Sequence, residues 1–149
     1  FATRPPDLLI DRRGDFVALR IAAGEAHLLE RNRDNWLRRQ MLQGAGAADG
    51  LAFATRADGR LRCDPLGCTI ATGGHRPLAI TLVAEAAAED CRRAAFVVLL
   101  EGPESCSSGT ASLGGRALWR SAGVALWLDG ERVSLRRVAD ATGARPWSR

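Results

Sequence analysis

Short apolar runs that alternate with tight turns constrain the fold of this chain more than any other feature of its sequence. The first three runs are Asp7–Asp11, Phe16–Ile21 and Ala26–Glu30. The segments between them, Arg12–Asp15 and Ala22–Glu25, each carry a glycine next to charged residues. Short runs bounded in this way are typical of strands joined by turns. The N-terminal part of the chain therefore predicts a three-stranded β-meander.

The strand pattern returns from Leu51 to Ala84, where Asp64–Gly67 is one of several turn signals. The run Phe96–Leu100 is continuously apolar, as in a strand that is buried on both faces. The segment Glu101–Gly115 is rich in serine and glycine and predicts a loop. Near the C-terminus, Asp129–Gly130 is a strong hairpin signal between two further strands.

Three segments have helical spacing of their apolar residues: Asn35–Gln43, Glu85–Ala94 and Arg116–Ala122. Together with the strands they predict an α/β (α+β) fold, a β-rich sheet with a few packed helices. A length of 149 residues fits one domain. Phe1–Pro6 predicts a linker, and residues 7–149 are expected to form a single domain. No apolar run approaches the roughly 18 residues of a membrane span.

Four cysteines, an even number, suit two disulfides or one metal site. Cys63 and Cys68 flank a four-residue turn, so they are expected to face each other across two strands and to form a disulfide. Cys91 precedes the buried strand and Cys106 follows it, and a helix packed on that strand would bring this pair together. Free thiols and a structural Cys₄ zinc site remain open as alternatives.

The two histidines, His27 and His75, belong to no metal-binding or catalytic motif. We interpret both as surface or edge residues, and the sequence predicts no catalytic residue, metal site or cofactor. The alternative is that they meet Asp64 or Asp90 in space and form the divergent site of a metal-dependent phosphodiesterase or nuclease.

All 21 basic residues are arginine, and the net charge of +4 permits contact with phosphate without requiring it. Four arginines surround Trp36: Arg31, Arg33, Arg38 and Arg39. Arginine beside an aromatic ring is the composition of a platform for single-stranded nucleic acid. The interpretation that we favour is a solvated helix face with Trp36 in the core.

Several short segments occur in an order known from one family: Pro6–Ile10, Phe16–Arg20, Cys63–Cys68, Glu89–Cys91, Ala95–Val98, Cys106 and Arg145–Trp147. In this order the chain resembles the C-terminal soluble domain of ComEC-type competence proteins of alphaproteobacteria. The resemblance covers most of the chain.

The resemblance implies a metallo-β-lactamase-like domain on the periplasmic side of an inner-membrane channel that takes up transforming DNA. It also implies that the membrane channel domain of the same protein precedes Phe1. Asp15 stands where the family has a G-Q-G-D-A motif, but the metal-binding H-x-H-x-D-H motif is absent. The expected function is therefore non-catalytic: the domain supports the channel or contacts single-stranded DNA. A nuclease with a divergent metal site and a Cys₄ zinc-stabilised interaction module are the alternatives.

Overall fold

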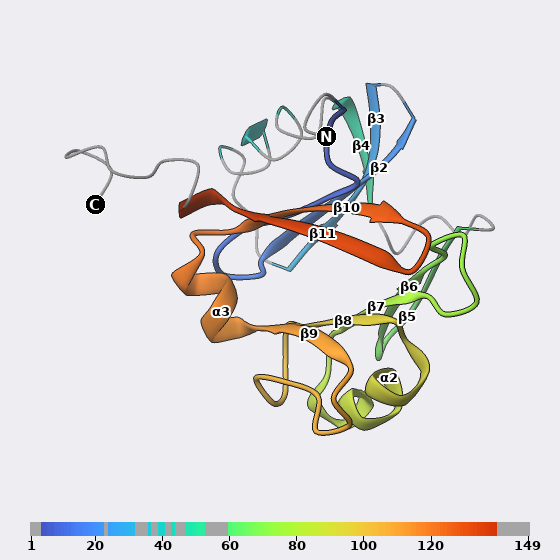
Figure 1. The fold of residues 1–149 in the computed structure, drawn as a ribbon. Coiled ribbons are helices and arrows are strands. Elements are labelled where there is room, and N and C mark those ends of the chain that lie inside the picture. Colours follow the sequence, from blue (N-terminus) through green and yellow to red (C-terminus); the bar gives the residue numbers. More distant parts are fainter. Residues whose placement is uncertain are drawn as a thin grey trace. The chain divides into compact units, whose positions relative to one another are not determined.

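Two β-sheets and a few short helices make up the computed structural model of the chain (Figure 1). The structure describes residues 4–22, 24–31, 36, 39–40, 43, 47–52 and 60–139. Strands account for most of the described elements, and parallel pairs occur beside antiparallel ones. The predicted β-rich α+β class is confirmed.

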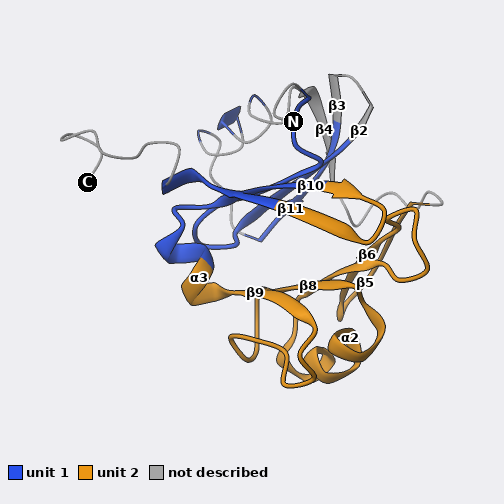
Figure 2. Cartoon of the chain, in the orientation of Figure 1, with its two compact units in different colours: residues 1–50, 118–127, 135–149 blue, residues 51–117, 128–134 orange. Residues whose placement is uncertain are grey.

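The described elements belong to two compact units (Figure 2). Unit 1 comprises residues 1–50, 118–127 and 135–149, and unit 2 comprises residues 51–117 and 128–134. The single domain expected for residues 7–149 stays a prediction. Arg4 lies within the predicted linker, yet its carbonyl oxygen accepts a 3.1 Å hydrogen bond from Trp127 Nε1 in unit 1.

The six-stranded sheet has the order β11-β10-β1-β2-β3-β4. Its strands are β1 (Leu8–Ile10), β2 (Phe16–Ala22), β3 (Gly24–Glu30), β4 (Ala47–Ala52), β10 (Val124–Asp129) and β11 (Arg132–Arg137). β1 pairs antiparallel with β2 and with β10, and β2 pairs antiparallel with β3. The predicted meander is confirmed. Phe16, Ala18 and Leu28 form a buried cluster on this sheet.

The five-stranded sheet of unit 2 has the order β5-β6-β7-β8-β9. Its strands are β5 (Leu61–Asp64), β6 (Gly67–Ile70), β7 (Leu78–Thr81), β8 (Phe96–Leu99) and β9 (Ala111–Gly114). β5, β6 and β7 are antiparallel neighbours, whereas β7, β8 and β9 run parallel. β8 is thus a central strand, and its residues 97–99 are buried, as the continuous apolar run predicts.

Helix α2 (Ala87–Arg93) follows the 3₁₀ turn η2 (Ala84–Ala86) and links β7 to the parallel strand β8. Its buried residues Ala87 and Cys91 pack against Ala79, Val97 and Leu99. These three sheet residues share one face, because side chains alternate along a strand and Ala79 is in register with Val97. Helix α2 therefore covers one face of β7 and β8.

The predicted loop Glu101–Gly115 is wrong at Ala111–Gly114, which forms the edge strand β9. Glycine suggested a loop there, but Gly114 has another role. A Cβ atom at this position would collide with the carbonyl oxygen of Glu104, so glycine permits close packing of two backbones. Leu113 in the same strand is buried.

The C-terminal elements agree with their predictions. Helix α3 (Gly115–Arg120) lies where a short helix is expected, and β10 and β11 form the expected hairpin around Gly130, whose φ is 59°. Positive φ in a tight hairpin turn favours glycine. None of the described helices has the length and apolarity needed to cross a membrane.

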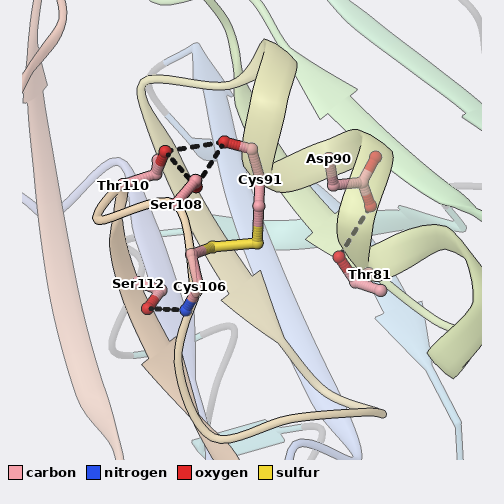
Figure 3. Close-up of a disulfide and its surroundings, with 7 residues drawn as sticks. All are labelled: Thr81, Asp90, Cys91, Cys106, Ser108, Thr110 and Ser112. Atoms are coloured by element: carbon pink, nitrogen blue, oxygen red, sulfur yellow. Dashed lines mark hydrogen bonds between the residues drawn. A yellow bond between two sulfur atoms is a disulfide. The ribbon is translucent and has the colours of Figure 1, made fainter.

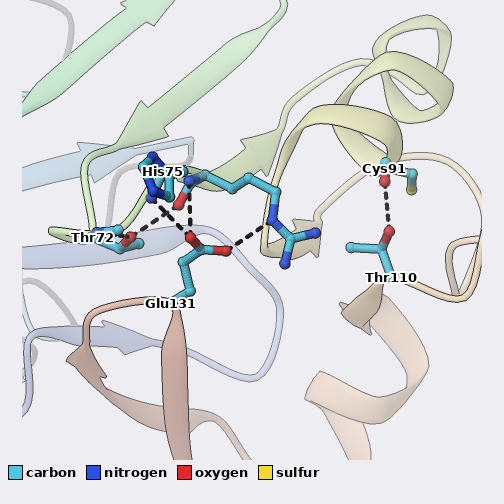
Figure 4. Close-up of polar contacts among 7 residues, drawn as sticks. Thr72, His75, Cys91, Thr110 and Glu131 are labelled. Atoms are coloured by element: carbon cyan, nitrogen blue, oxygen red, sulfur yellow. Dashed lines mark hydrogen bonds and ion pairs between the residues drawn. The ribbon is translucent and has the colours of Figure 1, made fainter.

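Glu131, at the tip of that hairpin, holds the loop between β6 and β7 within unit 2 (Figure 4). Its Oε2 accepts hydrogen bonds from the backbone N–H of His75 at 2.8 Å and of Arg76 at 3.3 Å. Its Oε1 lies 2.8 Å from Nε of Arg76. The hydrogen bond from the Arg76 side chain, followed by that from the His75 backbone, lowers the pKa of Glu131 below its usual value of 4.5.

Candidate nucleic-acid interface

The turn between β1 and β2 presents two neighbouring exposed arginines, Arg12 and Arg13, on unit 1. Asp11 builds this turn from a buried position. Its Oδ1 accepts a hydrogen bond of 2.9 Å from the N–H of Phe16, and its Oδ2 accepts one of 3.3 Å from the N–H of Arg13. The Asp11 carbonyl accepts a third, from Gly14, which adopts a φ of 70°. The two arginine side chains are therefore carried by a firmly bonded turn.

Trp119, near the end of α3, lies beneath these arginines with 46% of its surface exposed. The guanidinium carbon of Arg12 is 3.8 Å from the centroid of the Trp119 ring, and that of Arg13 is 5.8 Å away. Both distances are within the roughly 6 Å of a cation–π interaction. Nη2 of Arg12 also donates a 3.4 Å hydrogen bond to the Trp119 carbonyl oxygen. We refer to Arg12, Arg13 and Trp119 as the arginine–tryptophan cluster.

The cluster combines two groups that bind polyanions in different ways. A guanidinium stays charged at all physiological pH values and presents a planar fork of donors to phosphate. An exposed indole offers a flat surface on which a nucleic-acid base can stack. Among the described residues, neither Arg12 nor Arg13 forms an ion pair with a carboxylate. Their charges are therefore available to a ligand.

Arg31, one of the arginines singled out from the sequence, forms hydrogen bonds to the backbone of the turn that carries Arg12 and Arg13. The backbone N–H of Arg31 donates to the Asp15 carbonyl at 2.6 Å, and its Nη1 donates to the Gly14 carbonyl at 3.3 Å. Arg31 therefore braces the turn that carries Arg12. Arg39 is exposed. Two further arginines of the predicted set lie outside the described residues: Arg33 and Arg38.

The expectation that Trp36 lies in the core is wrong, because 67% of its surface is exposed. The described residues of its segment are helical and exposed: Trp36, Arg39, Gln40 and Gln43. These side chains lie at the surface and, apart from Trp36, are polar, so the described part of the segment faces solvent.

Sequence reasoning missed the arginine–tryptophan cluster. It assigned Arg12 and Arg13 to an ordinary turn and Trp119 to a short helix, and both assignments are correct locally. The two parts are 107 positions apart, so no local pattern connects them. Only the pairing of β1 with β10, which follows α3 directly, brings the turn and the helix together.

The predicted disulfides are both present. Cys63 and Cys68 are direct partners in the antiparallel pair β5–β6, with Cα atoms 4.1 Å apart. Cys91 on α2 is bonded to Cys106 in the loop after β8, with Cα atoms 5.6 Å apart (Figure 3). All four cysteines are thereby used, which contradicts the free-thiol and Cys₄ zinc alternatives.

The histidines do not form a metal centre with the acidic residues. His27 lies in β3 and is fully buried, which corrects the expectation of a surface or edge histidine. It is in register with Leu19 of β2, which is also fully buried, and cross-strand partners share one face of the sheet. His75 is exposed, as expected. Among the described residues, no group of three or more His, Cys, Asp or Glu side chains could hold a metal ion.

A second polar feature lies on unit 2, in a cleft of about 420 Å³ between α2 and β6. The buried hydroxyl of Thr81 donates a 2.6 Å hydrogen bond to Oδ2 of Asp90 (Figure 3). Burial raises the pKa of Asp90 above its ordinary value of 3.8; the Thr81 hydrogen bond opposes this rise, and the charges of Glu89 and Asp64 add to it. Glu89 is itself paired with Arg93 at 3.3 Å.

The fold and these sites define a β-rich α+β protein with two disulfides and an exposed arginine–tryptophan surface. Comparisons of the chain with family models, curated proteins and solved structures give no match. The chemistry of the molecule's own surface is therefore the basis for assigning its function.

Proposed function

We propose that this chain is a non-catalytic domain of a ComEC-type inner-membrane channel for uptake of transforming DNA, and that it contacts single-stranded DNA. The observation that carries the DNA contact is the guanidinium of Arg12 stacked 3.8 Å from the ring centroid of an exposed Trp119. Charge from arginine and a stacking surface from tryptophan are the two contributions that a single-strand binding surface needs. The metallo-β-lactamase-like character of the scaffold belongs to the same proposal.

The disulfides support a location on the periplasmic side of the inner membrane. Both pairs are formed, and disulfides persist in oxidising compartments such as the bacterial periplasm. The partner in this proposal is the membrane channel domain of the same protein. In this proposal the DNA crosses the periplasm before it enters the channel. An arginine surface on the periplasmic side would therefore meet the incoming strand.

The test of DNA contact is the binding of a fluorescently labelled oligothymidylate to the 149-residue chain at several salt concentrations. Each phosphate contact contributes about 0.7 to the slope of log K against log salt for a single strand. The double variant Arg12→Gln/Arg13→Gln should therefore lower that slope by about 1.4. Trp119→Ala should weaken binding by about 5- to 150-fold at each salt concentration and leave the slope unchanged.

Arg62→Gln is the matched control, because Arg62 is exposed but belongs to unit 2. It removes the same charge and should leave the slope within error of the parent. A chain that fails to bind the oligonucleotide at low salt would contradict the proposal. If Arg62→Gln and the single variant Arg12→Gln lower the slope of log K against log salt equally, the effect comes from net charge alone. The arginine–tryptophan cluster would then have no specific role in binding.

A further inference from the structure

A groove of about 490 Å³ lies on unit 2, between η2–α2 and the loop that follows β8. Alanines form its helical wall: Ala84, Ala87 and Ala88. Pro103 and three serines form its loop wall: Ser105, Ser107 and Ser108. Small-molecule sites are typically clefts of about 300–1,000 Å³ that are mainly apolar and carry a few polar groups. This groove has that size and composition.

The two walls are fixed to each other. The Cys91–Cys106 disulfide joins helix α2 to the loop (Figure 3). The hydroxyls of Thr110 and Ser108 both donate to the Cys91 carbonyl oxygen, at 2.6 Å and 3.3 Å (Figures 3 and 4). The groove is therefore formed before any ligand arrives, and a ligand would not have to order the loop.

Small residues keep the groove hollow. Ala87 is buried against the sheet, whereas Ala88 on the same helix is exposed and leaves space above it. On the loop side, Gly102 adopts a φ of 106° and comes so close to Ala84 that a Cβ atom would lie 3.3 Å from the Ala84 Cα. Glycine is thus needed to bring the loop against the helix at this depth.

Among its described lining residues, the groove carries positive charge only. Arg92 is the only ionisable side chain that lines it among the described residues. The neighbouring Arg93 points to a different cleft and pairs with Glu89. Glu104, in the loop, is also engaged elsewhere, because its Oε1 accepts a 2.7 Å hydrogen bond from the N–H of Arg116. Arg92 and the hydroxyls of Ser105 and Ser107 together offer hydrogen-bond donors and one positive charge, whereas the Ser108 hydroxyl is bonded to the Cys91 carbonyl.

We propose that this groove binds a small organic carboxylate with a short apolar body. The carboxylate would pair with the Arg92 guanidinium in a charge-assisted hydrogen bond and accept a second bond from Ser105 or Ser107. The apolar body would lie against the exposed alanines of the helical wall, Ala84 and Ala88. All residues of the site belong to unit 2. The proposal is therefore independent of the DNA contact on unit 1.

The test is a titration of the ¹⁵N-labelled chain with hexanoate, followed by amide chemical shifts. Hexanoate should shift the resonances of Arg92, Ser105 and Ser107 with a dissociation constant on the order of 1 mM, as expected for so small a ligand. Hexylammonium has the same apolar body with the opposite charge and should cause no shifts at these positions. An acetylated dipeptide with a free C-terminus distinguishes a peptide carboxylate from a free acid, because its bulkier body must also fit between the walls.

Two variants localise the binding. Arg92→Gln should weaken hexanoate binding about tenfold, whereas Arg93→Gln, the matched control one position away, should leave it unchanged. Ala88→Leu fills the groove from an exposed helical position that tolerates leucine, and it should abolish the shifts while the remaining spectrum stays intact. Equal shifts with hexylammonium, or unchanged affinity in Arg92→Gln, would overturn the carboxylate assignment. Unchanged binding in Ala88→Leu would place the ligand outside this groove.

Discussion

Arg12 stacks on Trp119 across 107 positions of sequence, with its guanidinium carbon 3.8 Å from the centroid of the ring. The contact joins the turn after β1 to the last turn of α3, and both side chains stay accessible at the surface. Apart from the Nη2 group, which donates to the Trp119 carbonyl oxygen, the in-plane donors of the stacked Arg12 guanidinium can reach a phosphate. The contact that stabilises unit 1 is therefore the same one on which the proposed DNA contact depends.

Replacing Arg12 by glutamine should lower the free energy of unfolding by about 0.5–1 kcal/mol, the size of an exposed cation–π contact. Arg13→Gln should cost less, because its guanidinium carbon lies 5.8 Å from the same ring. Urea unfolding measures both changes, and Arg62→Gln in unit 2 should leave the midpoint unchanged. An equal cost for Arg12→Gln and Arg13→Gln would contradict the geometry.

Asp11 should be the most sensitive residue of the turn. Asp11→Ala leaves the buried N–H of Phe16 without its 2.9 Å acceptor, which costs about 1–3 kcal/mol of stability. The variant should also weaken oligonucleotide binding, because the turn that carries Arg12 loses its support. Urea unfolding and the same fluorescence titration measure the two effects.

Asp64→Ala provides the comparison for Asp11→Ala. Asp64 accepts bonds from the N–H groups of Leu66 and Gly67 in a similar local pattern, but these bonds are exposed to water. Water replaces the lost acceptor there, so the cost should be clearly smaller. If Asp64→Ala proves as costly as Asp11→Ala, burial of the turn is not the source of its stability.

The two disulfides should differ in their contribution to stability. The chain-entropy relation gives about 3 kcal/mol for the 15-residue separation of Cys91 and Cys106, and about 2 kcal/mol for the five-residue separation of Cys63 and Cys68. Urea unfolding of the variants Cys91→Ser/Cys106→Ser and Cys63→Ser/Cys68→Ser should show this order.

Complete reduction of the parent should add about 4 Da to its intact mass, two hydrogens for each pair. An unchanged mass would contradict both disulfides.

Local patterns predicted most of the fold because its strands are short and their turns carry strong signals. The hairpin at Asp129–Gly130 and the cross-strand pair Cys63–Cys68 depend only on neighbouring residues, and both are present. β9 was missed for the opposite reason. Its glycine is required by a backbone ten positions earlier, at Glu104, and this requirement cannot be seen within the strand.

The candidate site was harder to predict than the fold. The proposed DNA contact depends on arginine beside tryptophan, and the sequence offered that composition around Trp36, where the residues are close in the chain. The structure places arginine against tryptophan at Arg12 and Trp119, which come together through sheet pairing. His27 shows the same difficulty, since its neighbours Ala26 and Leu28 on the opposite face of β3 are buried as well, and local sequence does not show that both faces are covered.

Ionised Glu131 should stabilise unit 2, and this contribution to the free energy of unfolding should be lost as the pH falls. Its pKa is lowered in the folded state, so the ionised form contributes stability that is fully present above about pH 4.5 and is lost as the pH falls through the lowered value. Glu131→Gln should remove this dependence and increase amide exchange at His75 and Arg76. The difference between parent and variant unfolding curves, measured at several pH values, isolates this effect. A constant difference across that range would contradict it.

Asp90 should act in the opposite direction. Its pKa is raised in the folded state, chiefly by burial, so stability decreases as the pH rises from about 3.8 through the raised value. Asp90→Asn keeps an acceptor for the Thr81 hydroxyl and removes the charge. It should therefore raise the free energy of unfolding at neutral pH, by less than about 1 kcal/mol because the group is partly exposed, and have little effect at acidic pH. Thr81→Val, which removes the opposing hydrogen bond, should make the parent's pH dependence steeper. Loss of stability in Asp90→Asn at neutral pH would mean that the bond from Thr81 to the carboxylate outweighs the cost of burying its charge.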